Sequence, residues 1–176
     1  MKKNNTFNQY GHSFQSKLVA SLLKDRPFLE QIQDILEPNY FESEANKWLV
    51  KKIKNYFVEY KSLPTMETVK VLMEDVDSDV LKMAIVDDLR NAYKHFEAAD
   101  LKFTQEKALD FCKNQKLKEA IIQSVEHLER GEYETIKLLV DEALKAGTEK
   151  DIGHIYLEMF EDRYSESVRT TTETPW

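Results

Sequence analysis

Hydrophobic residues recur mostly three or four positions apart along the chain, which is the spacing of one face of an α-helix. The clearest example is the stretch 104–146, which predicts two helices joined by a turn at residues 130–133. Thr104 is a typical N-cap, Gly131 suits the left-handed position that ends a helix, and Gly147 stops the second helix. The apolar stripes are Leu117, Ile121, Val125 and Leu128 on the first helix, and Ile136, Leu139, Val140 and Ala143 on the second.

Two helices joined by a short link form an antiparallel hairpin. Its first arm would be about 40 Å long at about 1.5 Å per residue. The partner arm alone cannot bury a narrow apolar stripe on a rod of that length, so we predict a subunit interface along the hairpin. The predicted interface residues are Leu117, Ile121, Val125, Leu128, Ile136, Leu139 and Val140.

The stretch 13–98 carries five shorter helical patterns and predicts a compact helical head, so the expected fold class is all-α. Pro38 and Pro64 interrupt the pattern. The predicted N-caps are Ser13, Asp25, Ser43, Thr65 and either Asp77 or Ser78. The predicted helix stripes include Phe14, Leu18, Leu22, Phe28, Ile32, Ile35, Leu36, Leu49, Ile53, Phe57, Val69, Ile85, Leu89 and Phe96. Residues 1–12 are polar, and we expect them to form a flexible lead-in.

The stretch 147–176 begins with a polar link, followed by one short amphipathic helix over about 152–164. The apolar residues of this linker helix are Ile152, Tyr156, Met159 and Phe160. An isolated helix shorter than about 12–15 residues is marginal in water, so we predict that its apolar face docks on another subunit or on an absent domain. Residues 165–176 have no period, and the large apolar Trp176 stands last. We therefore expect the natural protein to continue further.

The composition fits a protein with long exposed helices, because 41% of the residues are hydrophobic and 32% are charged. The net charge of −7 argues against a strong nucleic-acid binder, which usually has a basic surface. The single cysteine, Cys112, cannot form an internal disulfide and fits a reducing compartment. No apolar run approaches the about 20 residues that span a bilayer, and none follows Lys2 and Lys3 as in a signal peptide. We expect a soluble, cytoplasmic protein.

The sequence shows no arrangement of residues that is typical of an active site. The glycines stand at positions 11, 131, 147 and 153, which is too scattered for a phosphate-binding loop. The histidines, which share no metal-ligand spacing with one another or with Cys112, are His12, His95, His127 and His154. The run from Asp75 to Asp79 imitates a calcium loop, but Val80 and Val86 occupy the positions that need Gly and Glu. We predict no catalytic residue, cofactor or metal in this chain.

Five lysines lie along the helix that is predicted to begin after Ser43, and this helix also carries Tyr56 and Tyr60. These lysines are Lys47, Lys51, Lys52, Lys54 and Lys61. They indicate either a patch that binds nucleic acid or a partner, or a solvated face around a core stripe. We favour the solvated face, because the tyrosines belong to the apolar side and do not form a clean stacking platform.

Five segments follow one another in an informative order: the opening helix at 14–25, the aromatic-rich stretch 40–65 with its proline break, the hairpin and turn at 117–134, the linker helix at 151–163, and the stretch 169–176. Together they resemble the N-terminal part of replicative DNA helicases of the DnaB type, especially the phage-like branch. The last stretch resembles the entry to the RecA-like ATPase domain of that family.

The resemblance implies that the complete protein is an ATP-driven hexameric helicase of the replication fork. This chain would be its collar, in which hairpins pair into dimers and three dimers close a ring. It would also bind primase or a helicase loader, and the linker helix would pack on the ATPase domain of the neighbouring subunit. ATP, Mg and most DNA contacts would belong to the ATPase domain that is absent here. The polar lead-in and acidic charge depart from the family pattern, so the resemblance does not identify primase-binding residues.

Two other functions fit the same sequence. The chain could be a free-standing helical adaptor with no ATPase domain, or an accessory protein that binds single-stranded DNA through its lysine-bearing third helix. A phosphate-loop motif in the reading frame after Trp176 would favour the helicase. A salt titration of DNA binding would test the accessory protein.

Overall fold

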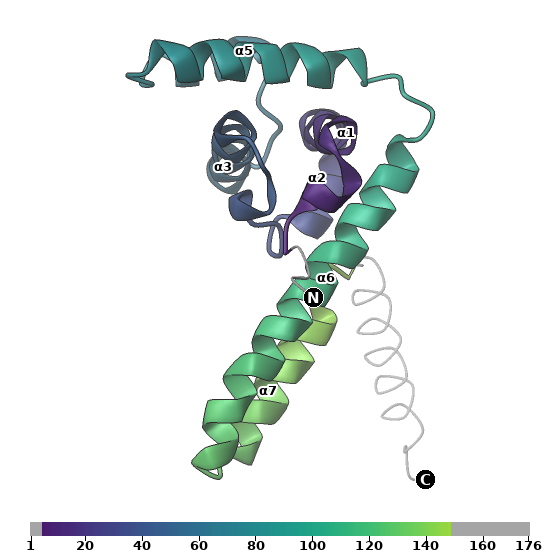
Figure 1. Cartoon of the computed structure of the whole chain (residues 1–176), viewed down its shortest axis with the longest axis vertical. Helices are drawn as coiled ribbons and strands as arrows, with labels where there is room; N and C mark the ends of the chain where they lie inside the picture. Colours follow the sequence, from purple (N-terminus) through teal and green to yellow (C-terminus); the bar gives the residue numbers. More distant parts are fainter. Residues whose placement is uncertain (1–4, 149–176) are drawn as a thin grey trace, which may run out of the picture.

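The computed structural model describes residues 5–148 of the chain, and every regular element in this range is helical (Figure 1). The prediction of an all-α fold is therefore confirmed. The α-helices are α1 (His12–Lys24), α2 (Arg26–Ile32), α3 (Glu44–Tyr60), α4 (Met66–Leu72), α5 (Asp79–Lys94), α6 (Leu101–Glu129) and α7 (Tyr133–Lys145), and the 3-10 helices are η1 (Phe7–Tyr10) and η2 (Pro38–Tyr40). The predicted linker helix at 152–164 lies outside the described residues.

Helices α1 to α5 form the head, and α1 is central to it. This helix contacts α2, α3, α5 and α6, and its Leu18, Val19 and Leu22 are completely buried. Helix α5 lies across α1 and α3 (Figure 1). A fully buried side chain of this size contributes about 1.5–3 kcal/mol to folding. This shared core therefore stabilises helices such as α2 and α4, which are too short to form alone.

Four of the predicted N-caps are confirmed, because each side-chain oxygen accepts a hydrogen bond from a backbone N–H three residues later. The acceptors are Asp25 at the start of α2, Ser43 at α3, Thr65 at α4 and Ser78 at α5. Their distances to the backbone nitrogens are 3.0, 2.9, 3.2 and 3.2 Å. These residues fix where the helices of the head begin.

The other two predicted N-caps, Ser13 and Thr104, are wrong. Helix α1 begins one residue before Ser13, and its cap position is Gly11, which has a positive φ of 83°. Helix α6 begins at Leu101, so Thr104 lies inside its first turn. The Thr104 side chain is buried and its hydroxyl donates to the backbone carbonyl of Asp100 at 3.2 Å. Threonine can bond in this way within a helix, and for that reason its presence does not locate the start.

The prediction of a flexible lead-in over residues 1–12 is wrong for the part that the structure describes. Residues 7–10 form η1, and Phe7 is completely buried. Its ring centroid lies 5.8 Å from that of Phe14, 5.2 Å from that of Phe41 and 4.6 Å from that of Phe111. One aromatic residue in a polar stretch therefore attaches the N-terminal segment to the head and to α6.

The second helix is shorter than the sequence pattern indicates. Helix α2 ends at Ile32, whereas the pattern extends to Pro38. Ile35 and Leu36 are nevertheless almost completely buried, in the turn that follows α2. Pro38 begins η2 rather than ending a helix. Residues can be buried at helical spacing without forming a helix. The predicted stripe is therefore correct about the burial of Ile35 and Leu36 and wrong about their helical backbone.

Helix α6 belongs to both the head and the hairpin, so the predicted division between 13–98 and 104–146 does not separate two bodies. Ala108, Phe111 and Cys112 near the middle of α6 are part of the core of the head. Beyond them α6 extends away from the head, and α7 runs back along it (Figure 1). The first arm of the hairpin is therefore the C-terminal part of a helix whose N-terminal part packs in the head.

Gly147 attaches the base of the hairpin to the head. It follows α7 with a φ of +68°, and a Cβ atom there would lie 2.5 Å from Cδ1 of Ile35. Its backbone carbonyl accepts a hydrogen bond from the side-chain amide of Gln31 at 3.1 Å. The missing side chain therefore allows a close approach that any other residue would hinder.

Candidate functional site

The two arms of the hairpin meet along an inner seam, made of Ala120, Ser124 and His127 on α6 and Ile136, Leu139 and Ala143 on α7. These residues recur at spacings of three and four, and they are all buried or half-buried. Ala120 and Ala143 are small, so the helices can approach closely. The Ser124 hydroxyl donates to the Ala120 carbonyl at 2.7 Å, which satisfies it inside the seam. The seam is therefore closed within one chain.

The next residue after each seam position on α6 is a large apolar one that the chain leaves exposed. Ile121, Val125 and Leu128 follow Ala120, Ser124 and His127, and their exposed fractions are 54%, 55% and 57%. One residue is a rotation of about 100° around a helix, so these side chains flank the seam. Neither α7 nor the head covers them.

Helix α7 contributes to the same face. Val140 and Leu144 follow the seam residues Leu139 and Ala143, and Tyr133 lies on the same side of the helix, seven positions before Val140. A two-fold axis perpendicular to the plane of an antiparallel helix pair exchanges the two helices and leaves the front of the pair in front. Residues that follow a seam residue by one position therefore lie on the same face of the pair in both helices. We call this the hairpin face, which consists of Ile121, Val125, Leu128, Tyr133, Val140 and Leu144.

The structure divides the seven predicted interface residues into two groups. Ile121, Val125 and Leu128 are exposed and belong to the hairpin face. Leu117, Ile136, Leu139 and Val140 are half-buried, and of these Ile136 and Leu139 are part of the inner seam. Sequence reasoning missed Tyr133 and Leu144, which are more than half exposed. The available signal was spacing, because Leu144 comes four residues after Val140 and Tyr133 seven residues before it.

The four residues predicted to dock the linker helix, namely Ile152, Tyr156, Met159 and Phe160, lie outside the described residues. Their docking stays a prediction.

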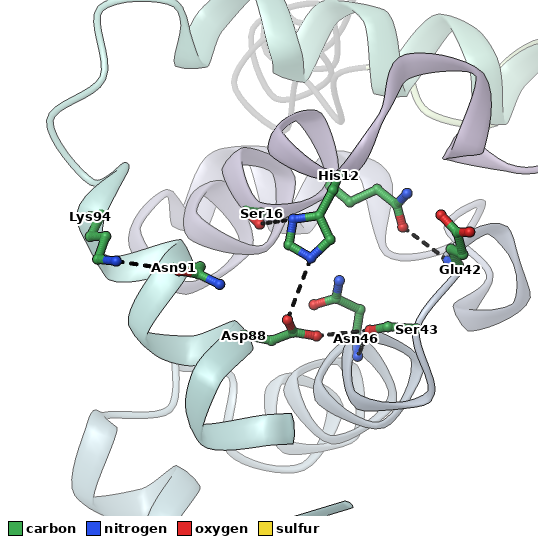
Figure 2. Close-up of polar contacts among 9 residues, drawn as sticks. His12, Ser16, Glu42, Ser43, Asn46, Asp88, Asn91 and Lys94 are labelled. Atoms are coloured by element: carbon green, nitrogen blue, oxygen red, sulfur yellow. Dashed lines mark hydrogen bonds and ion pairs between the residues drawn. The ribbon is translucent and has the colours of Figure 1, made fainter. Parts of the chain in front are cut away.

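The polar residues of the head form a network that joins α1, α3 and α5 (Figure 2). Asp88 accepts a hydrogen bond from the Ser43 hydroxyl at 2.8 Å and lies 3.7 Å from the His12 ring. The side-chain carbonyl of Gln15 accepts a hydrogen bond from the backbone N–H of Glu42 at 2.9 Å. Because the serine donates to the carboxylate and not to the histidine, the geometry differs from that of a nucleophilic triad. The network instead orients the start of α3.

The cysteine and the histidine at the turn of the hairpin lie in environments that indicate structural roles. Cys112 is completely buried, and this burial raises the pKa of its thiol well above the usual range, so the side chain stays protonated. His127 lies 2.6 Å from a carboxylate oxygen of Glu132, at the turn of the hairpin. Within residues 5–148, no three His, Cys, Asp or Glu residues are grouped so that they could hold a metal.

The lysines of α3 do not form a uniform basic patch. Lys54 is half-buried, its ammonium donates to the Leu36 carbonyl, and burial lowers its pKa. Lys47 pairs with Glu44 at 2.6 Å, and the Lys52 ammonium lies 5.6 Å from the Trp48 ring centroid. Three of the five lysines therefore have partners inside the chain, and Lys54 is not part of a solvated face. For the other lysines the solvated-face interpretation stays a prediction.

No helix in residues 5–148 has both the length and the apolarity needed to cross a bilayer. Comparison of the chain with protein-family models, with curated proteins and with solved structures gives no match.

Proposed function

We propose that this chain is the non-catalytic N-terminal domain of a hexameric replicative DNA helicase of the DnaB type. In this proposal the hairpin faces bring subunits together into a ring collar. The collar also binds primase or a helicase loader, while ATP hydrolysis and most DNA contacts belong to an ATPase domain beyond residue 176. The observation that carries the proposal is the apolar hairpin face, which extends away from the head on a closed helix pair.

The size of the hairpin face supports an assembly role. Burying a side chain of this class completely contributes about 1.5–3 kcal/mol, so burying the exposed half contributes about 1 kcal/mol. Leaving out the half-buried Val140, five such residues on each of two copies give about 10 kcal/mol. Association costs about 4–15 kcal/mol in lost freedom of motion. The two terms nearly balance, so assembly should depend on protein concentration, and a ring would need the further contacts of the complete protein.

The order of the elements also supports the proposal. A helical head, a protruding hairpin and a sequence that predicts a linker helix follow one another as the family resemblance implies. The linker helix would connect each ATPase domain to its neighbour, so that the nucleotide state of one subunit could influence the next. This role rests on the resemblance and on the sequence of residues 152–164.

The hairpin face can be tested by placing a charge on it. We expect Ile121→Asp to preserve helicity and to dissolve the oligomer, because an ionised carboxylate cannot be buried unpaired in an apolar interface. Leu139→Asp should also dissolve it, but this residue lies in the inner seam, so the substitution should loosen α7 as well. The measurement is mass by light scattering together with circular dichroism at one protein concentration.

Leu138→Asp is the matched control, because Leu138 is 62% exposed on α7 but lies about 200° around the helix from Val140 of the hairpin face. It should keep the wild-type mass. If Ile121→Asp also keeps the wild-type mass, or if Leu138→Asp lowers the mass equally, the hairpin face is not the interface.

A free-standing helical adaptor would use the same hairpin face to bind a different protein. The reading frame distinguishes the two functions, since a phosphate-loop motif within some tens of codons after Trp176 is expected only for the helicase. The single-stranded-DNA accessory protein is tested by a salt titration with wild-type chain and a Lys51→Gln, Lys61→Gln double variant. We expect no loss of affinity in the variant, because these lysines lie on a solvated face.

A further inference from the structure

A pocket of about 710 Å³ lies between the N-terminal segment and α6, apart from the hairpin face. The α6 side of the pocket includes Lys107, Asp110, Asn114 and Lys118. These residues are separated by three, four and four positions, so they follow one face of the helix. A pocket of this volume falls in the range of ligand sites in proteins, but its lining is mostly polar rather than apolar.

The two lysines stand at opposite ends of the α6 side. They are eleven positions apart, which is about 16 Å along the helix at about 1.5 Å per residue. The Lys118 ammonium donates to the side-chain carbonyl of Asn5 at 2.9 Å, and the Lys107 ammonium lies 5.7 Å from the Phe103 ring centroid. Neither lysine forms an ion pair with another described residue. Within the described part of the chain, neither ammonium group is therefore held in an ion pair, and Asp110 is the one carboxylate that lines the same pocket.

Carboxamide side chains line the space between the lysines. Gln9, Asn114 and Gln115 line the pocket, and their side chains have no hydrogen bond to other described residues. Each carboxamide offers both a donor and an acceptor, which is the pattern that the backbone of an extended peptide presents. The Tyr10 ring, stacked on Phe14 at 4.6 Å between centroids, adds a partly exposed aromatic surface.

We propose that this pocket binds an extended segment of a partner protein that carries two acidic side chains four residues apart, on the same face of the segment. At about 3.3 Å per residue, four residues of extended chain span about 13 Å, and the flexible lysine and acidic side chains cover the remaining few ångströms between Lys107 and Lys118. The carboxamides would pair with the peptide backbone, and the lysines would pair with the acidic side chains.

A nucleic acid fits the pocket less well than an acidic peptide does. Asp110 lies about one helical turn from Lys107 on the same face and would repel each phosphate of a nucleic acid that passes it. The chain carries a net charge of −7, so a polyanion that extends beyond the pocket meets unfavourable charge. A short peptide carries only two charges and does not extend beyond the pocket, so it meets both penalties to a smaller extent.

The pocket proposal does not rest on ring assembly. It requires only the contact between the N-terminal segment and α6, which Phe7 and Phe111 maintain. Loss of oligomerisation in Ile121→Asp should therefore leave peptide binding intact, so failure of one proposal is distinguishable from failure of the other.

The test uses the wild-type chain and a fluorescein-labelled five-residue peptide with glutamate at its first and last positions and serine between them. Fluorescence anisotropy should show saturable binding. Lys107→Gln and Lys118→Gln should each weaken binding by about threefold, and the double variant by about tenfold, as expected for exposed ion pairs. The matched control is Lys137→Gln with Lys145→Gln, two exposed lysines of α7, which should leave the affinity unchanged.

Peptides with glutamine at both ends, or with the two glutamates adjacent, should bind at least several-fold more weakly. The proposal is overturned if the α7 control loses as much affinity as the pocket variant, or if the peptide does not bind. It is also overturned if a six-nucleotide oligothymidine binds the pocket more tightly than the peptide, or if assembly of the chain displaces the probe, which would assign the pocket to a second copy.

Discussion

Replacing Gly147 with alanine tests how the base of the hairpin is attached to the head. The new Cβ atom would lie 2.5 Å from Cδ1 of Ile35, 3.1 Å from Cδ1 of Leu109 and 3.1 Å from Cε of Lys113. All three are ends of side chains, so they can shift, but the two apolar ones pack against the core of the head. Overpacking of this kind costs about 1–3 kcal/mol. The positive φ of +68° adds about 1–2 kcal/mol for any residue with a Cβ atom.

Gly147→Ala should therefore lower the free energy of unfolding by about 2–5 kcal/mol in urea titrations followed by circular dichroism. Gly131→Ala is the control, because Gly131 has a φ of +72° but nothing within 4 Å of the added Cβ atom. It should cost only the backbone part, about 1–2 kcal/mol. Equal losses in the two variants would refute the close approach of Gly147 to the head.

Three further predictions concern the head. Phe7→Ala should lower the free energy of unfolding by about 3–5 kcal/mol, because Phe7 is buried against four aromatic rings, and a loss below about 1 kcal/mol would mean that the N-terminal segment is not attached. Ser43→Ala should cost about 1 kcal/mol or more, because the side chain caps α3 and binds Asp88, whereas Ser13→Ala should change stability by less than about 0.5 kcal/mol; equal effects would contradict the cap assignment. Cys112 should react with a thiol reagent at pH 8 only as fast as the chain opens, because burial keeps the thiol protonated, and fast labelling of the native chain would place it at the surface.

The helices of the head were largely predictable because their starts have local chemical signals. Asp25, Ser43, Thr65 and Ser78 each bind a backbone N–H within three residues, so the sequence contains both partners of the contact. The start of α6 has no side-chain cap, and Asp100 at that position makes no capping hydrogen bond. Thr104, which we predicted as the start, is of a capping type but lies inside the helix.

The burial of Phe7 could not be predicted because its partners are distant in sequence. Phe41 and Phe111 come from the segment before α3 and from α6, and no periodicity connects them to a polar N-terminal stretch. The same reason explains Gly147, whose close neighbour Ile35 belongs to the turn after α2. Long-range packing, rather than local pattern, decides both positions.

The hairpin shows a mixed outcome for a geometric reason. The apolar stripe on α6 was predicted to form one interface. In the structure, α7 instead packs against Ala120 and Ser124, whose small side chains each precede a stripe residue by one position. The apolar residues Ile121, Val125 and Leu128 are thereby left on an exposed face. On α7 the larger residues Ile136 and Leu139 fill the seam. Which side of an amphipathic helix faces its partner depends on residue size, and helical spacing alone does not show it.

The most direct test of the proposed assembly role is the mass of the wild-type chain in solution across a dilution series, measured by sedimentation velocity. The account predicts a mass that rises with concentration from one chain of 20.7 kDa toward dimers or larger species, because the hairpin faces of two chains bury each other. A mass of one chain at every concentration up to the millimolar range would contradict it.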